Sequence, residues 1–203
     1  MSFHPEIPYT TGQHRSERLL SPEGEPFAFT PEQRARLEEL ASHYPPERRK
    51  SAVIFALFMV QEQVGYVSRS GMRHVAEVIG CTPAEVEEVA TYYAMFYKQP
   101  VGTFVIQVCR TLSCALKGAE RVTEEIANAL HIKPGETDTT GTFTLIEVEC
   151  LGACDRAPVV MVNDGWHECL RPEDAVKLLD VIRSKGEAGL SGCVHRVEKE
   201  VEK

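Results

Sequence analysis

The chain has 203 residues, of which 43% are hydrophobic, and its 22 basic and 30 acidic residues give a formal net charge of -8. This length and composition allow a buried core in one ordinary domain or two small ones. The acidic balance, without a basic stripe, argues against a nucleic-acid-binding protein, because such proteins need clustered Lys and Arg. The longest apolar run, residues 52–60, is shorter than the about 18 to 20 residues of a transmembrane helix, so we expect a soluble chain.

Residues 1–29 contain four prolines among polar residues and show no secretory signal pattern. Glu6 and Glu17 are atypical of organelle presequences, which are poor in acidic residues. The sequence therefore predicts a flexible N-terminal arm and a reducing cytoplasmic location. In that location seven cysteines indicate metal or redox chemistry rather than a disulfide framework.

Residues 30–98 are predicted to form a helical bundle. Thr30 and Thr82 each precede a proline and stand three residues before Gln33 and Glu85, which is the pattern of a capping box at a helix start. The expected helices cover about 30–43, 47–64, 69–80 and 82–93. The second contains the apolar run 52–60 and should be the buried, central one. The aromatic stretch 92–97 is interpreted as core or interface packing.

Residues 99–186 are predicted to form an α/β domain with a four-stranded mixed sheet, followed by a C-terminal tail over 187–203. The expected strands are 104–108, 143–149, 159–162 and 166–170, with helices over 115–130 and 172–183. The helix between the first two strands predicts a right-handed parallel crossover. Asn163-Asp164-Gly165 predicts a hairpin between the last two strands.

Two cysteine pairs follow the first two strands. Cys109 and Cys114 are separated by four residues, and Cys150 and Cys154 by three. Because a parallel crossover places the carboxyl ends of its two strands at one edge of the sheet, both pairs should converge there. Four thiolates in two pairs are the ligand set of a [2Fe-2S] cluster.

Zinc is the main alternative, since sites built from four cysteines use similar spacings. The residues between Cys109 and Cys114 favour a cluster, because their hydroxyl and amide groups suit hydrogen bonds to cluster sulfur. A thiol oxidoreductase is disfavoured because no C-x-x-C pair is present. The successive two-residue gaps of [4Fe-4S] ferredoxins are absent too.

The two cysteine spacings, the Ala157-Pro158 that follows them and the helical first half together identify a family. Over residues 30–186 the chain resembles the thioredoxin-like [2Fe-2S] subunits of the NADH-dehydrogenase module of NADH-quinone oxidoreductase, respiratory complex I. The resemblance implies a thioredoxin-like fold and one [2Fe-2S] cluster. The implied ligands are Cys109, Cys114, Cys150 and Cys154.

The resemblance also implies a partner, a flavoprotein subunit that binds NADH and FMN, and a place in a peripheral arm on the cytoplasmic side of the cell membrane. This chain contains neither G-x-G-x-x-G nor a P-loop, so we expect hydride chemistry in that partner. A flavin converts the two electrons of a hydride into single-electron steps, which makes this chain the one-electron acceptor without a catalytic site of its own. An NAD-linked hydrogenase or formate dehydrogenase subunit, or a zinc-stabilised interaction domain, are the alternatives.

Several smaller hypotheses concern the surroundings of the cysteines. Apolar side chains are expected to frame the cluster and limit water, and nearby acids are expected to make it hard to reduce. The residues in question are Leu112, Leu116, Leu151 and Ala153, with Glu149 and Asp155 as the acids. Pro158 is a candidate cis proline. Cys193 is hypothesised to approach Cys169, and His131 and His167 are interpreted as helix-terminal or surface histidines.

Overall fold

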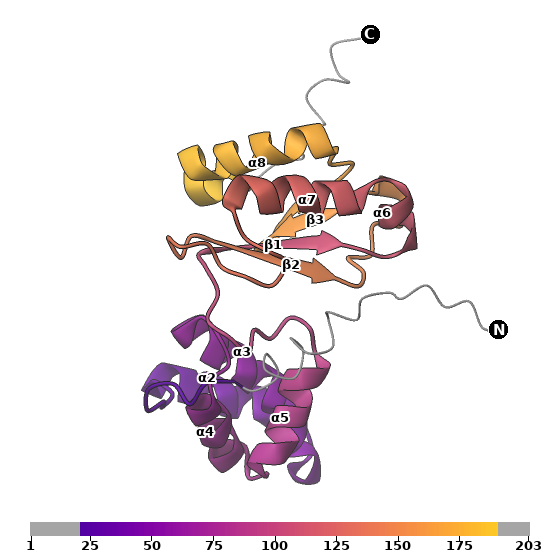
Figure 1. The fold of residues 1–203 in the computed structure, drawn as a ribbon. Coiled ribbons are helices and arrows are strands. Elements are labelled where there is room, and N and C mark those ends of the chain that lie inside the picture. The colour runs from indigo at the N-terminus through magenta and orange to yellow at the C-terminus, as the bar shows by residue number, and fades with distance from the viewer. Residues whose placement is uncertain (1–20, 191–203) are drawn as a thin grey trace, which may run out of the picture. The chain divides into compact units, whose positions relative to one another are not determined.

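The computed structural model describes residues 21–190 of the chain. The chain divides into two compact units, Met1–Pro100 and Val101–Lys203. The first unit is helical, and the second is mixed α/β, as the sequence predicts (Figure 1).

Two helices of the first unit begin where the predicted capping boxes place them. The elements are α2 (Pro31–Ser42), the 3-10 helix η1 (Pro46–Ala52), α3 (Val53–Val64), α4 (Arg69–Ile79) and α5 (Pro83–Tyr92). Thr30 and Thr82 each accept a hydrogen bond from the backbone of the third helical residue, whose side chain bonds back to the cap. Both predicted capping boxes are confirmed.

The second predicted helix, 47–64, is wrong in its first part. Pro46 begins a 3-10 helix that continues into α3 at Val53, and such tighter turns are common at the start of α-helices. α3 contributes five residues to the core and is central, as predicted. It is not buried on every side, however, because Phe55 and Phe58 are 37% and 44% exposed.

Residues 21–29 pack against the helical unit, whereas the sequence predicted a flexible arm that extended to residue 29. Phe27 and Phe29 pack edge-on around the ring of His74 and against the core of the helical unit. The backbone N–H of Phe29 donates to His74 Nε2 over 3.2 Å, and the carbonyl of Pro22 accepts from the N–H of Arg69. Two aromatic side chains anchor this segment despite its proline content. Residues 1–20 lie outside the described part.

The second unit contains a four-stranded sheet with strand order β2-β1-β3-β4. The strands are β1 (Phe104–Cys109), β2 (Phe143–Val148), β3 (Val160–Val162) and β4 (Gly165–His167). β1 pairs with β2 in parallel and with β3 antiparallel, and β3 and β4 form the predicted hairpin. The peptide bond between Ala157 and Pro158 is cis, as hypothesised.

Helices cover one face of this sheet (Figure 1). α7 (Ala119–Leu130) and α8 (Pro172–Lys185) contact each other and share a buried core with the strands. The single helix predicted over 115–130 is instead two, because α6 (Leu112–Leu116) ends before Gly118. Gly118 has a φ of 92°, a left-handed conformation that glycine adopts without strain and that interrupts an α-helix. Within residues 21–190, no helix is long and apolar enough to cross a membrane.

Candidate metal centre

The first cysteine pair is buried at the carboxyl end of β1. Cys109 is the last residue of this strand and is 2% exposed, and Cys114, in α6, is 1% exposed. The second pair is on the surface. Cys150 follows the end of β2, and Cys154 opens a short 3-10 helix, η2 (Cys154–Arg156).

The parallel pairing of β1 and β2 brings the two cysteine-bearing loops together. Cys109 lies opposite Val148 in the register, and the N–H of Arg110 donates to the Val148 carbonyl over 3.0 Å. The Cys109 Sγ donates to the carbonyl of Glu149 over 3.6 Å, and Arg110 forms an ion pair with the Glu149 side chain at 2.7 Å. α6 also contacts η2. The sheet edge therefore gathers both loops, although 35 residues separate the pairs in sequence.

Hydrogen bonds surround the sulfur atoms. The Thr111 hydroxyl lies 3.2 Å from Cys109 Sγ, and the Gly152 N–H donates to Cys150 Sγ over 3.3 Å. Burial raises the pKa of the Cys109 thiol, but hydrogen bonds from Thr111 and from the Leu151 backbone outweigh it and lower the pKa overall. A thiolate at Cys109 thus has donors from both loops.

The pKa of the Cys114 thiol shifts in the opposite direction. Burial, followed by its hydrogen bond to Cys109, raises the pKa of the Cys114 thiol to about 11. The Cys114 thiol therefore holds its proton more tightly than an ordinary cysteine, and a metal that binds there must displace that proton. A smaller electrostatic contribution from Cys154 raises the pKa of Cys114 in the same direction, so the second loop lies within electrostatic range of Cys114.

The donor set fits an iron-sulfur cluster. The two cysteine-bearing loops meet at one sheet edge, and a hydroxyl and a backbone amide lie within hydrogen-bonding distance of Cys109 and Cys150, as suits the sulfur atoms of such clusters. Among residues 21–190, no three His, Cys, Asp or Glu side chains are arranged around a single metal position. The assignment of all four cysteines as ligands therefore stays a prediction.

The predicted apolar frame is only partly present. Leu151 and Ala153 pack against the core of the α/β unit, but Leu112 and Leu116 of α6 are 74% and 78% exposed. The two acids expected to disfavour reduction are each paired with an arginine. Glu149 pairs with Arg110, and Asp155 pairs with Arg156 at 3.4 Å. These ion pairs weaken the argument that the acids make the site hard to reduce.

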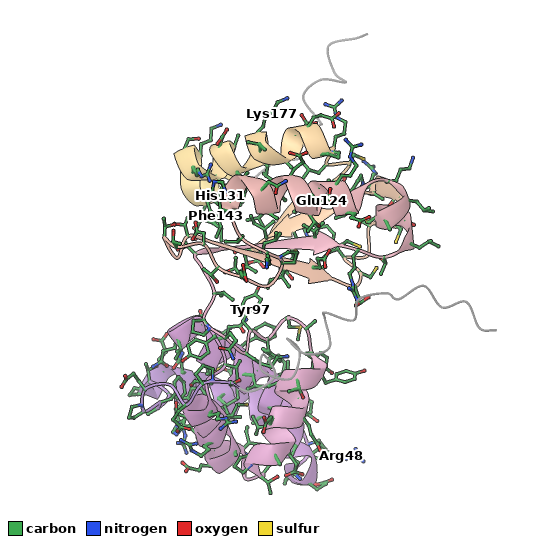
Figure 2. The ribbon with its side chains drawn as sticks, in the orientation of Figure 1. Arg48, Tyr97, Glu124, His131, Phe143 and Lys177 are labelled. Atoms are coloured by element: carbon green, nitrogen blue, oxygen red, sulfur yellow. The ribbon has the colours of Figure 1, made fainter. Side chains whose placement is uncertain are left out.

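The remaining cysteines and histidines have separate positions. Cys169 is exposed, whereas Cys193 lies outside the described residues, so the hypothesis that joins them stays untested. His131 ends α7, as interpreted from the sequence (Figure 2). His167 is not a surface residue: it is 1% exposed in β4, and neither ring nitrogen has a hydrogen-bond partner. Side chains alternate between the two faces of a strand, and His167 lies opposite the buried Val160 of the hairpin partner. This alternation is the sequence signal that places His167 on the buried face.

Comparison with known proteins places this geometry in a family. Residues 37–183 match the family model for thioredoxin-like [2Fe-2S] ferredoxins. NADH-quinone oxidoreductase subunit 2 of Thermus thermophilus is 40% identical over 149 residues, which cover 73% of this chain and 82% of that protein. The mitochondrial NADH dehydrogenase [ubiquinone] flavoprotein 2 of Dictyostelium discoideum is 37% identical over 172 residues, 84% of this chain and 70% of that protein.

A solved structure shares the fold at low sequence identity. A chain in the crystal structure of NAD+-reducing [NiFe]-hydrogenase in the air-oxidized state aligns with a TM-score of 0.57 at 17% identity. The alignment covers 66% of this chain and 23% of that chain.

Proposed function

Because the chain belongs to the thioredoxin-like [2Fe-2S] ferredoxin family, we propose that its two cysteine pairs hold one [2Fe-2S] cluster and that it transfers single electrons. The proposed ligands are Cys109, Cys114, Cys150 and Cys154. The observation that carries the proposal is the meeting of the two cysteine-bearing loops where β1 and β2 end side by side. When bound, such a cluster supplies a redox centre that accepts one electron at a time.

The residues of the chain have distinct parts in this proposal. The rigid ends of β1 and β2 hold the two loops at a fixed separation, which keeps the ligands in place during electron transfer. Amide and hydroxyl hydrogen bonds to sulfur stabilise negative charge on the thiolates and so set the potential. Burial of Cys109 and Cys114 excludes water from one side of the site.

A metal and sulfide assay tests the cluster directly. Anaerobically purified full-length chain should contain about two irons and about two acid-labile sulfides and should give an axial electron paramagnetic resonance signal after reduction. A colourless protein that contains one zinc and no sulfide would instead establish the zinc-stabilised interaction domain.

We further infer that the chain works in NADH-quinone oxidoreductase, with the FMN of a partner flavoprotein that oxidises NADH as the electron donor. The names and the 37% to 40% identity of its relatives support this assignment. The partner and the FMN belong to the proposal, as does the position in a peripheral arm on the cytoplasmic side of the cell membrane. The alternative assembly is an NAD-linked hydrogenase or formate dehydrogenase.

Purification from the native host separates these assemblies. A tagged chain should copurify with an FMN-containing subunit and with quinone-reducing membrane subunits. Copurification with a hydrogenase or formate dehydrogenase catalytic subunit would contradict the assignment while leaving the cluster proposal intact.

A further inference from the structure

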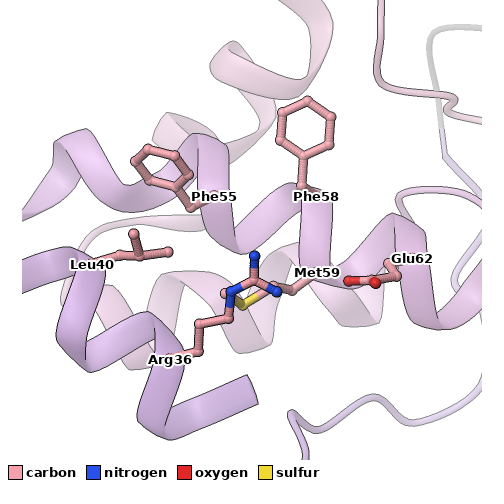
Figure 3. A pocket seen from close by; sticks show the side chains of 6 residues that line it. All are labelled: Arg36, Leu40, Phe55, Phe58, Met59 and Glu62. Carbon is pink, nitrogen blue, oxygen red and sulfur yellow. The ribbon is translucent and has the colours of Figure 1, made fainter. Parts of the chain in front are cut away.

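The helical unit, which carries none of the four candidate ligands, has a cavity of about 190 Å³ between α2 and α3 (Figure 3). Its lining consists of Arg36 and Leu40 from α2 and of Phe55, Phe58, Met59 and Glu62 from α3. The α2 positions are four residues apart, and those of α3 follow the spacing i, i+3, i+4 and i+7. Each helix therefore presents one continuous face to the cavity.

The mouth of this cavity is apolar and open. Phe55 and Phe58 project from α3 toward the same side and are 37% and 44% exposed (Figure 3). Phe58 packs edge-on against Phe96 with ring centroids 5.0 Å apart, so its ring is held in position by the core. Neighbouring exposed aromatic rings beside a cavity are typical of a protein interaction site rather than of scattered surface residues.

The charged groups that line the cavity have no partner of their own. Arg36 and Glu62 are both exposed, and within residues 21–190 neither forms an ion pair or a side-chain hydrogen bond. Other charged side chains of this unit do pair, as Arg49 does with Glu38 at 2.7 Å. The cavity thus combines an apolar floor with one cation from α2 and one anion from α3.

We propose that this face binds an amphipathic helix of another subunit of the same assembly. The apolar side chains of that helix enter between α2 and α3, a carboxylate faces Arg36, and a basic side chain faces Glu62. Two helical faces that flank an apolar groove are suited to a third helix, whose anchors repeat every three or four residues. The cavity is smaller than the about 300 to 1,000 Å³ of typical small-molecule sites, which favours side chains of a protein over a free ligand.

Photo-crosslinking in the native assembly tests this proposal. Benzoylphenylalanine replaces Phe55 in the full chain, the complex is assembled in the host and irradiated, and crosslinked peptides are identified by mass spectrometry. We expect a peptide from a different subunit, with an apolar stripe and both an acidic and a basic residue. Arg36→Glu in the same background should lower the crosslink yield about five-fold, the effect of a lost interaction of about 1 kcal/mol.

Arg48→Glu is the matched control, because Arg48 is also exposed in the helical unit but does not line the cavity (Figure 2). It should leave the yield unchanged. Reversal of the acidic residue in the captured peptide should restore the yield with Arg36→Glu. The proposal would be overturned if the crosslinked peptide came from a second copy of this chain, or if irradiation did not raise the yield of crosslinked product. It would also be overturned if Arg48→Glu lowered that yield as much as Arg36→Glu.

The identity of the partner as a subunit of the same assembly rests on the proposed function. Iron and sulfide measured in the same samples distinguish a failure of the helix-binding proposal from a failure of the proposed electron-transfer function. A loaded cluster without the crosslink contradicts only the helix-binding face, whereas a crosslink on a chain without iron and sulfide contradicts only the electron-transfer function.

Discussion

Removing the charge of Asp174 should destabilise the α/β unit at neutral pH. The Asp174 side chain is 4% exposed and accepts hydrogen bonds from Arg171 Nε at 2.7 Å and from Lys177 Nζ at 3.0 Å. The hydrogen bond from Arg171, assisted by that from Lys177, holds the pKa of Asp174 at about 2, against an ordinary value of 3.8. Asp174 also lies in the first turn of α8, where the helix dipole favours negative charge.

The pKa difference sets an upper limit on the effect. At about 1.36 kcal/mol per pKa unit, a fall from 3.8 to about 2 corresponds to at most about 2.4 kcal/mol. The side chains of Arg171 and Lys177 are 51% and 69% exposed, so solvent screens part of this interaction. We therefore expect Asp174→Asn to lower the free energy of unfolding by about 1 to 2 kcal/mol at pH 7.

The effect should depend on pH with a defined sign. A carboxyl group whose pKa is lower in the folded state contributes its full stability above the unfolded pKa and loses it as pH falls through the folded pKa. The difference between wild type and Asp174→Asn should therefore be complete above about pH 5 and should disappear toward about pH 2.

Urea unfolding of the cluster-free chain at pH 7 and at about pH 3 measures this difference. Trp166 in β4 is the only tryptophan, so its fluorescence reports on the α/β unit. Asp180→Asn in the same helix is the control. Asp180 is 66% exposed and, among residues 21–190, pairs only with Arg183, at 3.3 Å, so its loss should cost less than about 0.5 kcal/mol. Equal effects of the two variants at pH 7, or an Asp174→Asn effect that is undiminished at low pH, would refute the reasoning.

Three further predictions concern the site and the sheet. Cys114→Ser should lower the iron and sulfide content and the thermal stability of the purified chain, whereas Cys169→Ser should change neither. Replacing the exposed Leu112 and Leu116 together by serine should slow reduction of the chain by NADH and the proposed flavoprotein partner in stopped-flow experiments, with unchanged iron content; an unchanged rate would exclude these leucines from the proposed contact. Gly102→Ala should destabilise the chain by about 2 to 4 kcal/mol in urea unfolding, because a Cβ there would lie 2.8 Å from backbone atoms of Thr142.

The local signals for helix starts and strand ends were strong enough to predict most of the fold. Thr30 and Thr82 begin complete capping boxes, and Asn163-Asp164-Gly165 forms a hairpin turn. The positions of these helix starts and of this turn are therefore determined by local sequence. The meeting of the two cysteine loops followed from the parallel crossover, which a helical segment between two strands already implies.

The errors arose where tertiary packing decides the outcome. The anchoring of residues 21–29 depends on His74, which is distant in sequence, so the proline-rich composition alone predicted an arm. The burial of His167 and the exposure of Leu112 and Leu116 depend on which side of the sheet or helix is covered. The break at Gly118 could have been suspected from the glycine, but the apolar periodicity continued across it.

The unequal burial of the two cysteine pairs has a consequence for how the site is loaded. In the proposed cluster site, iron and sulfide that arrive from solvent would meet Cys150 and Cys154 first, because these two cysteines are exposed whereas Cys109 and Cys114 are buried. We therefore expect assembly to proceed in order, from the outer loop to the inner one. Alkylation of the cluster-free chain should follow the same order and should label the outer pair well before the inner pair.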